Sequence, residues 1–307
     1  MNLGQYNLIV VTGPTAGGKT AFAARLAYEL NGEIISADSR QIYRQMDIGT
    51  GKDLDDYRVS GISIPVHLVD IVEPGYKYSV FEYQRDFYAA FRQISANNKI
   101  PVLCGGSGMY IHAAVRNYRL IEVPVNENLR KQLESKTLDE LTAILTEYKT
   151  LHNQTDTDTV EHALRAIEIQ QYYREHIQPE EDTTEIRPFL LGILYDREIE
   201  RARITERLHR RLKEGMVEEV RGLLDSGIPA DSLEYYGLEY RYITQYLTGK
   251  LGYDKMISLL NTAIHQFAKR QRTWFRKMER EGITIHWIAG DLPMEEKIEI
   301  AKRLVVC

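Results

Sequence analysis

An eight-residue glycine-rich segment near the N-terminus constrains the fold of this chain more than any other stretch. Residues 13–20 read GPTAGGKT and match G-x-x-x-x-G-K-[ST] at every position. An apolar run, residues 8–11, precedes the segment, and a helix-favouring run, residues 21–30, follows it. A glycine-rich loop between a strand and a helix turns its backbone N–H groups towards an anion, and the helix start adds partial positive charge. The pattern predicts a phosphate-binding loop in an α/β fold.

Two side chains of this segment carry specific chemistry. Lys19 supplies a mobile ammonium group for phosphate oxygens, and the Thr20 hydroxyl can bind Mg²⁺. The residues expected to surround the phosphate are Gly13, Pro14, Thr15, Ala16, Gly17, Gly18, Lys19 and Thr20. The loop alone does not identify the phosphate compound that it binds.

Composition excludes several classes of protein. The 307 residues allow one large domain or two, and 43% hydrophobic with 27% charged residues is ordinary for a globular protein. Two cysteines exclude a disulfide scaffold and a cysteine-rich zinc site. We expect a cytoplasmic protein without a membrane segment, because the sequence shows neither a signal peptide nor an apolar run of spanning length.

Two further loops are expected at the same edge of the predicted sheet. Residues 33–37 form a second predicted strand that ends at Asp38, and residues 100–104 form another that opens into a glycine-rich segment containing Ser107. Ligands of parallel α/β sheets bind beyond the carboxyl ends of the strands. Asp38 could act there as a base, hold Mg²⁺ through water, or only cap a turn. Ser107 could contact an anion or a sugar, or only serve a tight turn.

The chain between these loops has two more expected elements. Residues 62–71 are an apolar segment, and a helix is expected from Ser79 to about residue 96. Ser79 and Glu82 have the spacing of a capping box.

The alternation of strands and helices stops near residue 116. Helices are expected at residues 127–133, 138–148 and 159–173, an acidic loop at 179–184 and a returning strand at 189–194. This pattern favours a P-loop NTPase-like α/β core, a parallel sheet flanked by helices, formed by residues 1–115 and 188–307. An all-helical insertion domain, residues 116–187, would interrupt it.

The remainder is expected to be mainly helical and locally basic. A long arginine-rich helix is predicted at 199–224, another helix at 256–277 and a last strand at 283–287. Net charge is −5, yet residues 261–280 carry six Lys or Arg against one Glu, with aromatic side chains interleaved. Such a segment is either a solvated helix face or an RNA-binding surface. The phosphate loop and Asp38 alone would favour a phosphoryl-transfer enzyme.

Several segments over nearly the whole chain make it similar to the bacterial tRNA dimethylallyltransferase (isopentenyltransferase) family. Besides the phosphate loop they are ADSRQIYRQMDIGTGK at 37–52, HLVDIVEP at 67–74, YSVFEYQRD at 78–86, GGSGMY at 105–110, RAIEI at 165–169, the DRE and R-I-x-x-R pattern at 196–207 and AKRQRTWFRK at 268–277. The resemblance implies transfer of a dimethylallyl group from dimethylallyl diphosphate to N6 of the adenosine 3′ of the anticodon, position 37 of tRNA. A phosphate loop suits the diphosphate leaving group, because negative charge builds up there.

The resemblance also implies roles for individual residues. Asp38 would be the catalytic base, Lys19 and Arg241 would neutralise the diphosphate, Thr20 would hold Mg²⁺, and Ser107 would contact the nucleotide or the diphosphate. The implied tRNA contacts are Asp38, Ser39, Arg40, Gln41, Ser107, Arg130, Glu161, His162, Ala163, Leu164, Arg165, Lys269 and Arg272. The implied partners are dimethylallyl diphosphate and the anticodon stem-loop, with the protein as a monomer.

The chain departs from the family pattern at two places. Thr159 and His162 stand where relatives commonly have other residues, and Glu239 replaces a frequent glycine before Tyr240 and Arg241. Three other functions remain open at this point. They are a small-molecule kinase, an isopentenyltransferase acting on free adenine nucleotides, and a nucleotide-dependent RNA-binding switch without chemistry.

Overall fold

The structure is a computed structural model, and it describes residues 4–116, 120, 122–148, 157–176 and 185–306. The chain divides into two compact units. One contains residues 1–118 and 185–307, and the other contains residues 119–184. The acidic loop expected at 179–184 lies outside the described residues.

The larger unit is built on a six-stranded parallel sheet in the order β5-β2-β6-β1-β7-β8. Its strands are β1 (Leu8–Thr12), β2 (Gly32–Ser36), β5 (Val66–His67), β6 (Ile100–Cys104), β7 (Pro188–Leu194) and β8 (Ile285–Ala289). The strand that precedes the phosphate loop, β1, therefore lies in the middle of the sheet, between β6 and β7. This architecture confirms the predicted parallel α/β fold.

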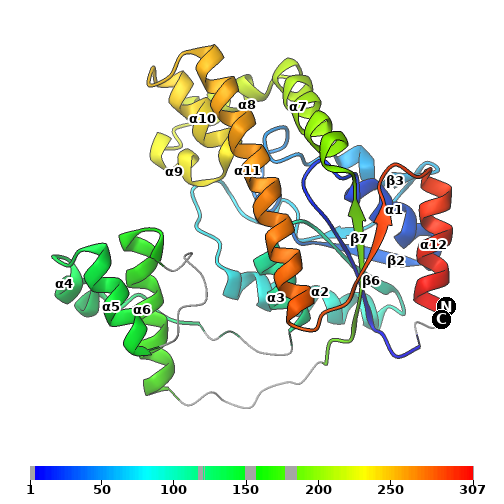
Figure 1. Ribbon diagram of the computed structural model, residues 1–307, viewed down its shortest axis with the longest axis horizontal. Helices are drawn as coiled ribbons and strands as arrows, with labels where there is room; N and C mark the ends of the chain where they lie inside the picture. Colours follow the sequence, from blue (N-terminus) through cyan, green and yellow to red (C-terminus); the bar gives the residue numbers. More distant parts are fainter. Residues whose placement is uncertain (1–3, 117–119, 121, 149–156, 177–184, 307) are drawn as a thin grey trace. The chain divides into compact units, whose positions relative to one another are not determined.

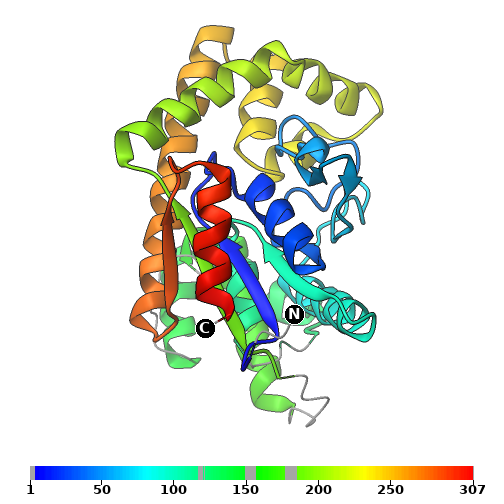
Figure 2. The ribbon, with the colours of Figure 1, turned by 90° about the vertical axis from the view of Figure 1, so that its right-hand side faces the viewer.

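Alternate residues of β1 pack against helices on opposite faces of the sheet. Ile9 and Val11 belong to the core under α1 (Lys19–Leu30) and α12 (Met294–Val306). Leu8 and Val10 belong to the core on the other face. That second core includes residues of α2 (Val80–Ala96), α3 (Gly108–Val115) and α11 (Tyr253–Arg280). Figure 2 shows α12, in red, in front of the sheet, and Figure 1 shows the long helix α11.

The helix expected after Ser79 has the predicted start. The Ser79 hydroxyl accepts a hydrogen bond from the Glu82 backbone N–H, and the Glu82 carboxylate accepts one from the Ser79 backbone N–H. Both halves of the capping box are therefore present.

Two predicted elements are each divided into shorter ones. The expected apolar segment at 62–71 contains β4 (Ile62–Ser63), which pairs with β3 (Arg58–Val59) in a separate antiparallel sheet, and β5 in the main sheet. The single helix expected at 199–224 is wrong. It is two helices, α7 (Arg197–Lys213) and α8 (Met216–Asp225), separated by Gly215, whose φ of 101° cannot continue a right-handed helix.

Helices α9 (Ala230–Tyr235) and α10 (Leu238–Leu247) complete the larger unit. The described part of the smaller unit is helical, with α4 (Glu127–Leu133), α5 (Leu138–Tyr148) and α6 (Val160–Glu175). Its core contains the apolar residues Leu133, Leu141, Leu145, Ala163, Ala166 and Ile167. Within the described residues, no helix has both the length and the apolar character needed to cross a membrane.

The carboxylate of Glu219 on α8 fixes the loop at 47–49. It accepts backbone hydrogen bonds from Asp47, Ile48 and Gly49, at 2.8, 2.7 and 3.0 Å, and a further one from the Tyr240 hydroxyl at 2.7 Å. Three successive N–H groups thus form an anion-binding nest that the protein fills with its own side chain.

Replacing Glu219 with alanine is expected to lower the free energy of unfolding by about 2 kcal/mol, because charge-assisted hydrogen bonds are lost and backbone donors are left unpaired. Urea denaturation monitored by circular dichroism measures the change. The exposed neighbour Glu218 provides the control, since its replacement with alanine is expected to leave the midpoint nearly unchanged. Equal midpoints for both variants would show that the nest does not stabilise the fold.

Candidate functional site

Three loops meet at one edge of the sheet, beyond the carboxyl ends of β1, β6 and β2. The phosphate loop follows β1, the segment Gly105–Gly108 follows β6, and Asp38 follows β2. The backbone N–H of Ser39 donates to the Ser107 hydroxyl at 3.1 Å, which joins the second and third of these loops. The predicted proximity of Asp38 and Ser107 to one edge is therefore present in the structure.

The phosphate loop has the backbone geometry that its glycines predict. Gly18 has a left-handed φ of 68° and directly precedes α1. A side chain at Gly13 would collide with the backbone carbonyl of Ile193 on β7. These two glycines are required because one lies in a conformation that L-residues rarely adopt and the other touches neighbouring backbone.

Lys19 lies in a partly buried position at the start of α1. Its ammonium group donates to the Pro14 carbonyl at 2.7 Å. Burial lowers the pKa of Lys19 to about 8, and the positive charge of Arg207 also lowers it, whereas Asp38 acts in the opposite direction. A bound polyanion would favour the protonated form, so an anion and this lysine stabilise each other in the site.

One carboxylate oxygen of Asp38 accepts a hydrogen bond within its own loop. Its Oδ1 accepts a hydrogen bond from the Arg40 backbone N–H at 2.9 Å, the geometry of an aspartate turn. Among the described residues, Oδ2 has no recorded hydrogen-bond partner. The predicted turn role and the predicted role as a base are thus compatible in one side chain. Gln41, by contrast, is buried and donates to the Gly51 carbonyl at 3.1 Å.

A row of arginines on α7 lies beside the phosphate loop, and the sequence analysis gave these side chains no role in the site. Arg203, Arg207 and Arg211 are spaced by four residues and share one face of the helix. Arg203 Nε donates to the Ala16 carbonyl at 3.0 Å, and Arg211 pairs with Asp53 at 3.2 Å. The i, i+4 spacing was the available signal, but spacing alone does not say which surface such a helix face meets.

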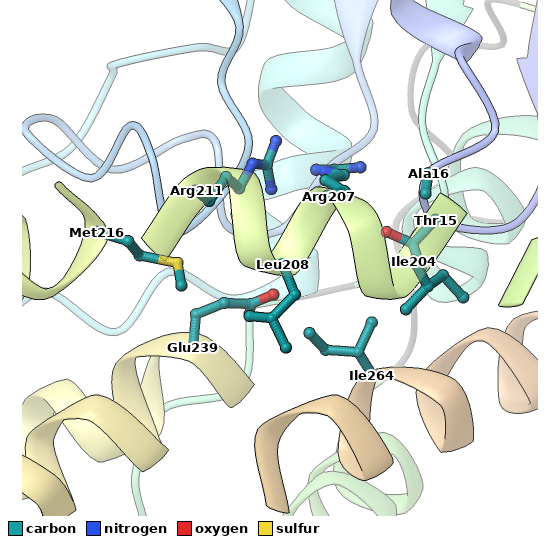
Figure 3. A pocket seen from close by; sticks show the side chains of 9 residues that line it. All are labelled: Thr15, Ala16, Ile204, Arg207, Leu208, Arg211, Met216, Glu239 and Ile264. Atoms are coloured by element: carbon teal, nitrogen blue, oxygen red, sulfur yellow. The ribbon is translucent and has the colours of Figure 1, made fainter. Parts of the chain in front are cut away.

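Arg207 and Arg211 line a small cavity with two residues of the phosphate loop. Figure 3 shows both arginines extending from the same side of α7. The full lining is Thr15, Ala16, Ile204, Arg207, Leu208, Arg211, Met216, Glu239 and Ile264. Burial, together with the positive charge of the neighbouring Arg211, lowers the pKa of Arg207 to about 10. Arg207 forms no ion pair within the described part of the chain, so its charge is available to an anion at the phosphate loop.

Glu239 contributes a partly buried carboxyl group to the same cavity. Burial raises the pKa of Glu239, while Arg211 and Arg207 act in the opposite direction. The departure from the family pattern at this position therefore adds an acidic group near the arginines.

Arg241 lies on α10, and its side chain bonds to α9 and not to the phosphate loop. Its Nε donates to the Glu234 backbone carbonyl at 3.3 Å, and its side chain is exposed. The role that the resemblance implied for Arg241 at the diphosphate gains no support from this contact, because the side chain already bonds to α9. Arg207 has the position that was expected of Arg241.

The residues at the phosphate loop fit a magnesium ion shared with a ligand. Among the described residues, no three His, Cys, Asp or Glu side chains are grouped to hold a metal ion. Mg²⁺ commonly combines few protein ligands with water and substrate phosphates, so the Thr20 hydroxyl at the first turn of α1 is compatible with such an ion.

In the smaller unit, the residues expected to contact RNA have varied surroundings. Arg130 and Arg165 both pair with the buried Glu168, at 2.7 and 3.0 Å, and Ala163 is fully buried. Ala163 therefore cannot present its side chain to RNA. Arg130 joins α4 to α6 through Glu168, and Arg165 pairs with the same carboxylate within α6. Glu161 and His162 are exposed, and Leu164 is partly buried. The Thr159 hydroxyl accepts from the His162 backbone N–H at 3.1 Å and caps α6.

On α11, one of the two residues expected to contact RNA is exposed, and the other is engaged in an ion pair. Lys269 is exposed. Arg272 is bound to the Glu200 carboxylate at 2.7 Å and to the Tyr195 carbonyl at 2.9 Å. Arg276 and Arg280 add exposed positive charge further along the helix. In the second half of α11, the exposed basic residues are therefore Lys269, Arg270, Arg276 and Arg280.

Comparison with known proteins shows one consistent group of relatives. A family model described as IPP transferase matches residues 41–278, and one described as isopentenyl transferase matches residues 6–62. A protein named tRNA dimethylallyltransferase 2 from Bacteroides fragilis is 59% identical over 303 residues, covering 99% of this chain and 98% of the relative. A tRNA dimethylallyltransferase 1 from Parabacteroides distasonis is 55% identical, covering 98% of both chains.

Solved structures of similar fold come from bacteria and from a eukaryote. A tRNA isopentenylpyrophosphate transferase from Bacillus halodurans superposes with a TM-score of 0.69 at 28% identity, covering 98% of this chain and 97% of that one. A eukaryotic dimethylallyltransferase acting on tRNA has a TM-score of 0.78 at 21% identity, covering 98% of this chain and 80% of that one. Because the eukaryotic protein is only 21% identical to this chain, its similarity shows a shared fold and nothing more.

Proposed function

This chain belongs to the IPP transferase family, and on that basis we propose that it is a tRNA dimethylallyltransferase. It transfers the dimethylallyl group of dimethylallyl diphosphate to N6 of adenosine 37, giving N6-isopentenyladenosine and diphosphate. The observation that supports this most is the meeting of the phosphate loop with Asp38 and Ser107 at one sheet edge. A leaving diphosphate and an acceptor base could approach each other there.

In the proposed reaction, the N6 lone pair forms a bond to C1 of the allylic group while the C1–O bond to the diphosphate breaks. Asp38 orients the exocyclic amine and receives its proton. Lys19 and Arg207 stabilise the negative charge that develops on the diphosphate, because both cations lie at the phosphate loop before the reaction begins. Mg²⁺ held by Thr20 and the diphosphate would supply further neutralisation of the leaving group.

The cavity lined by Ile204, Leu208 and Ile264 has a volume of about 20 Å³. It is therefore too small for the hydrocarbon part of the donor, because a space of this size holds little more than one water molecule. The adenine must leave the anticodon stack to reach Asp38, at a cost of a few kcal/mol.

Mass spectrometry of tRNA incubated with the protein, Mg²⁺ and dimethylallyl diphosphate tests the proposal. We expect a mass increase of one dimethylallyl group on a single adenosine of the anticodon loop. Incubation with AMP separates this activity from transfer to free nucleotides, and labelled ATP separates it from a kinase. Prenylated AMP with unmodified RNA, or phosphate transfer without a prenyl product, would contradict the proposal.

Size-exclusion chromatography tests the proposed monomer, and cell fractionation tests the proposed cytoplasmic location.

Reversing two exposed charges on α11 is expected to weaken tRNA binding. The double change Lys269→Glu and Arg276→Glu removes cations that track RNA phosphates, so the slope of log affinity against log salt should flatten by about 0.7–0.9 per lost contact. Filter binding at several salt concentrations measures it. Lys255→Glu, at the start of the same helix, is the control for a general charge effect. Arg272 is unsuitable for this test, because reversing its charge would also break the ion pair with Glu200.

Should the slope of the double variant equal that of the wild type, Lys269 and Arg276 do not contact RNA phosphates. An equal loss in the Lys255→Glu control would instead indicate a long-range electrostatic effect, not a local contact.

A further inference from the structure

A single side chain of α11 joins two of the loops at the site. Gln271 is only 7% exposed. Its Oε1 accepts a hydrogen bond from the Thr15 backbone N–H at 2.8 Å, and its Nε2 donates to the Gly106 carbonyl at 2.8 Å. Thr15 belongs to the phosphate loop after β1, and Gly106 belongs to the loop after β6, the neighbouring strand.

The contact between α11 and these loops is close on both sides of Gln271. A side chain at Gly106 would have its Cβ 2.5 Å from Gln271 Nε2. One turn further along α11, Trp274 packs so closely on Gly108 that a Cβ there would overlap the indole ring. The loop after β6 is therefore glycine-rich partly because α11 side chains occupy the space that its own side chains would need.

The chemistry of the position requires an amide group. A glutamine of this length both accepts and donates, so it can satisfy an N–H on one loop and a carbonyl on the other. A glutamate accepts but does not donate, and a methionine of similar size does neither with useful strength. Because the site is buried, a side chain that lacks either function leaves a backbone N–H or carbonyl without a hydrogen bond. The loop can then move to find another hydrogen-bond partner for that group.

We propose that Gln271 is a positioning residue for the donor, an inference that rests on the proposed function. It holds the beginning of the phosphate loop so that the following N–H groups are oriented towards the diphosphate before the ligand arrives. It holds Gly106 at the same time, and so keeps Ser107 within reach of the Asp38 loop. Both polar atoms of its amide are used by the protein, so Gln271 acts through these loops and not by touching the substrate.

The test compares donor binding with RNA binding in Gln271→Met and Gln271→Glu. Calorimetric titration with inorganic diphosphate in the presence of Mg²⁺ gives the affinity for the anion, and steady-state kinetics give KM for each substrate. We expect Gln271→Met to weaken diphosphate binding and raise KM for the donor at least about tenfold, because preorganised donors are lost. KM for the anticodon stem-loop should stay within about twofold.

Gln271→Glu is expected to bind diphosphate no better than Gln271→Met, because it loses the bond to Gly106 and adds negative charge beside the phosphate loop. Gln266→Met is the matched control, since Gln266 is exposed on the same helix. Hydrogen exchange of the wild-type protein provides a measurement that does not depend on how the variants fold. The Thr15 amide should exchange slowly in the absence of ligand.

Three results would overturn the inference. They are unchanged diphosphate affinity in a folded Gln271→Met protein, a parallel loss of donor affinity, RNA affinity and thermal stability, and rapid exchange of the Thr15 amide. If the wild-type protein itself fails to bind diphosphate, the proposed function fails instead. The two failures are therefore distinguishable by the behaviour of the wild type.

Discussion

Replacing Asp38 with asparagine is expected to reduce kcat on the anticodon stem-loop by at least about a hundredfold, because a positioned base contributes this much in typical enzymes. An aromatic amine is a weak nucleophile, and it needs an acceptor for its proton as the new C–N bond forms. The asparagine oxygen can still accept the hydrogen bond from the Arg40 backbone N–H, so the loop should keep its conformation. The affinity for tRNA should therefore remain close to that of the wild type.

Single-turnover kinetics with saturating tRNA and donor measure the chemical step directly. Asp55→Asn, an exposed position in the short helix Leu54–Tyr57, controls for the loss of one negative charge. A normal single-turnover rate in Asp38→Asn would remove the assignment of Asp38 as the base. A loss of tRNA binding equal to the loss of rate would make Asp38 a binding residue.

Replacing Arg207 with glutamine is expected to lower kcat/KM for dimethylallyl diphosphate by roughly a hundredfold or more, as loss of one preorganised charged donor at a developing anion typically does. Arg207 lines the cavity beside the phosphate loop, with its guanidinium next to that of Arg211 at Gly51, and it forms no ion pair in the described part of the chain. Its positive charge can therefore pair with an anionic ligand. Because the side chain is removed from water, the attraction between Arg207 and the anion is stronger than it would be in water.

Arg210 offers a control on the same helix. Its side chain is 59% exposed and pairs with Glu214 one turn away, so Arg210→Gln should leave kcat/KM for the donor nearly unchanged. Arg241→Gln then separates the two assignments for the diphosphate arginine. A large effect at Arg241 with none at Arg207 would restore the role implied by the resemblance and would contradict the one argued from the cavity.

Local sequence patterns determined many elements of the fold. The phosphate-loop motif with its flanking runs predicted β1, the loop and α1, because glycine spacing and hydrophobic periodicity are local properties of the chain. The capping box at Ser79 predicted the start of α2 for the same reason. The helix break at Gly215 was missed, since a glycine within a helical pattern does not by itself reveal its φ.

The site was predicted less completely. Asp38 and Ser107 could be placed at the phosphate-loop edge because all ligand-binding loops of a parallel sheet lie beyond the same strand ends. The partners of the arginines could not be predicted in this way. Arg130, Arg165 and Arg272 are engaged by buried or partly buried carboxylates, whereas Arg207 is not, and sequence composition treats all four alike.

The sequence by itself determined the chemistry of the first loop, the α/β class and the family. Only the tertiary structure decided that α7 brings Arg207 to this loop and that Gln271 of α11 ties it to the next one. The physical reason is the separation along the chain. The hydrogen bonds from Arg203 of α7 and Gln271 of α11 to the phosphate loop span 187 and 256 positions, whereas the patterns of helices, turns and caps act over only a few residues. Which side chain reaches which loop depends on how the helices pack on the sheet.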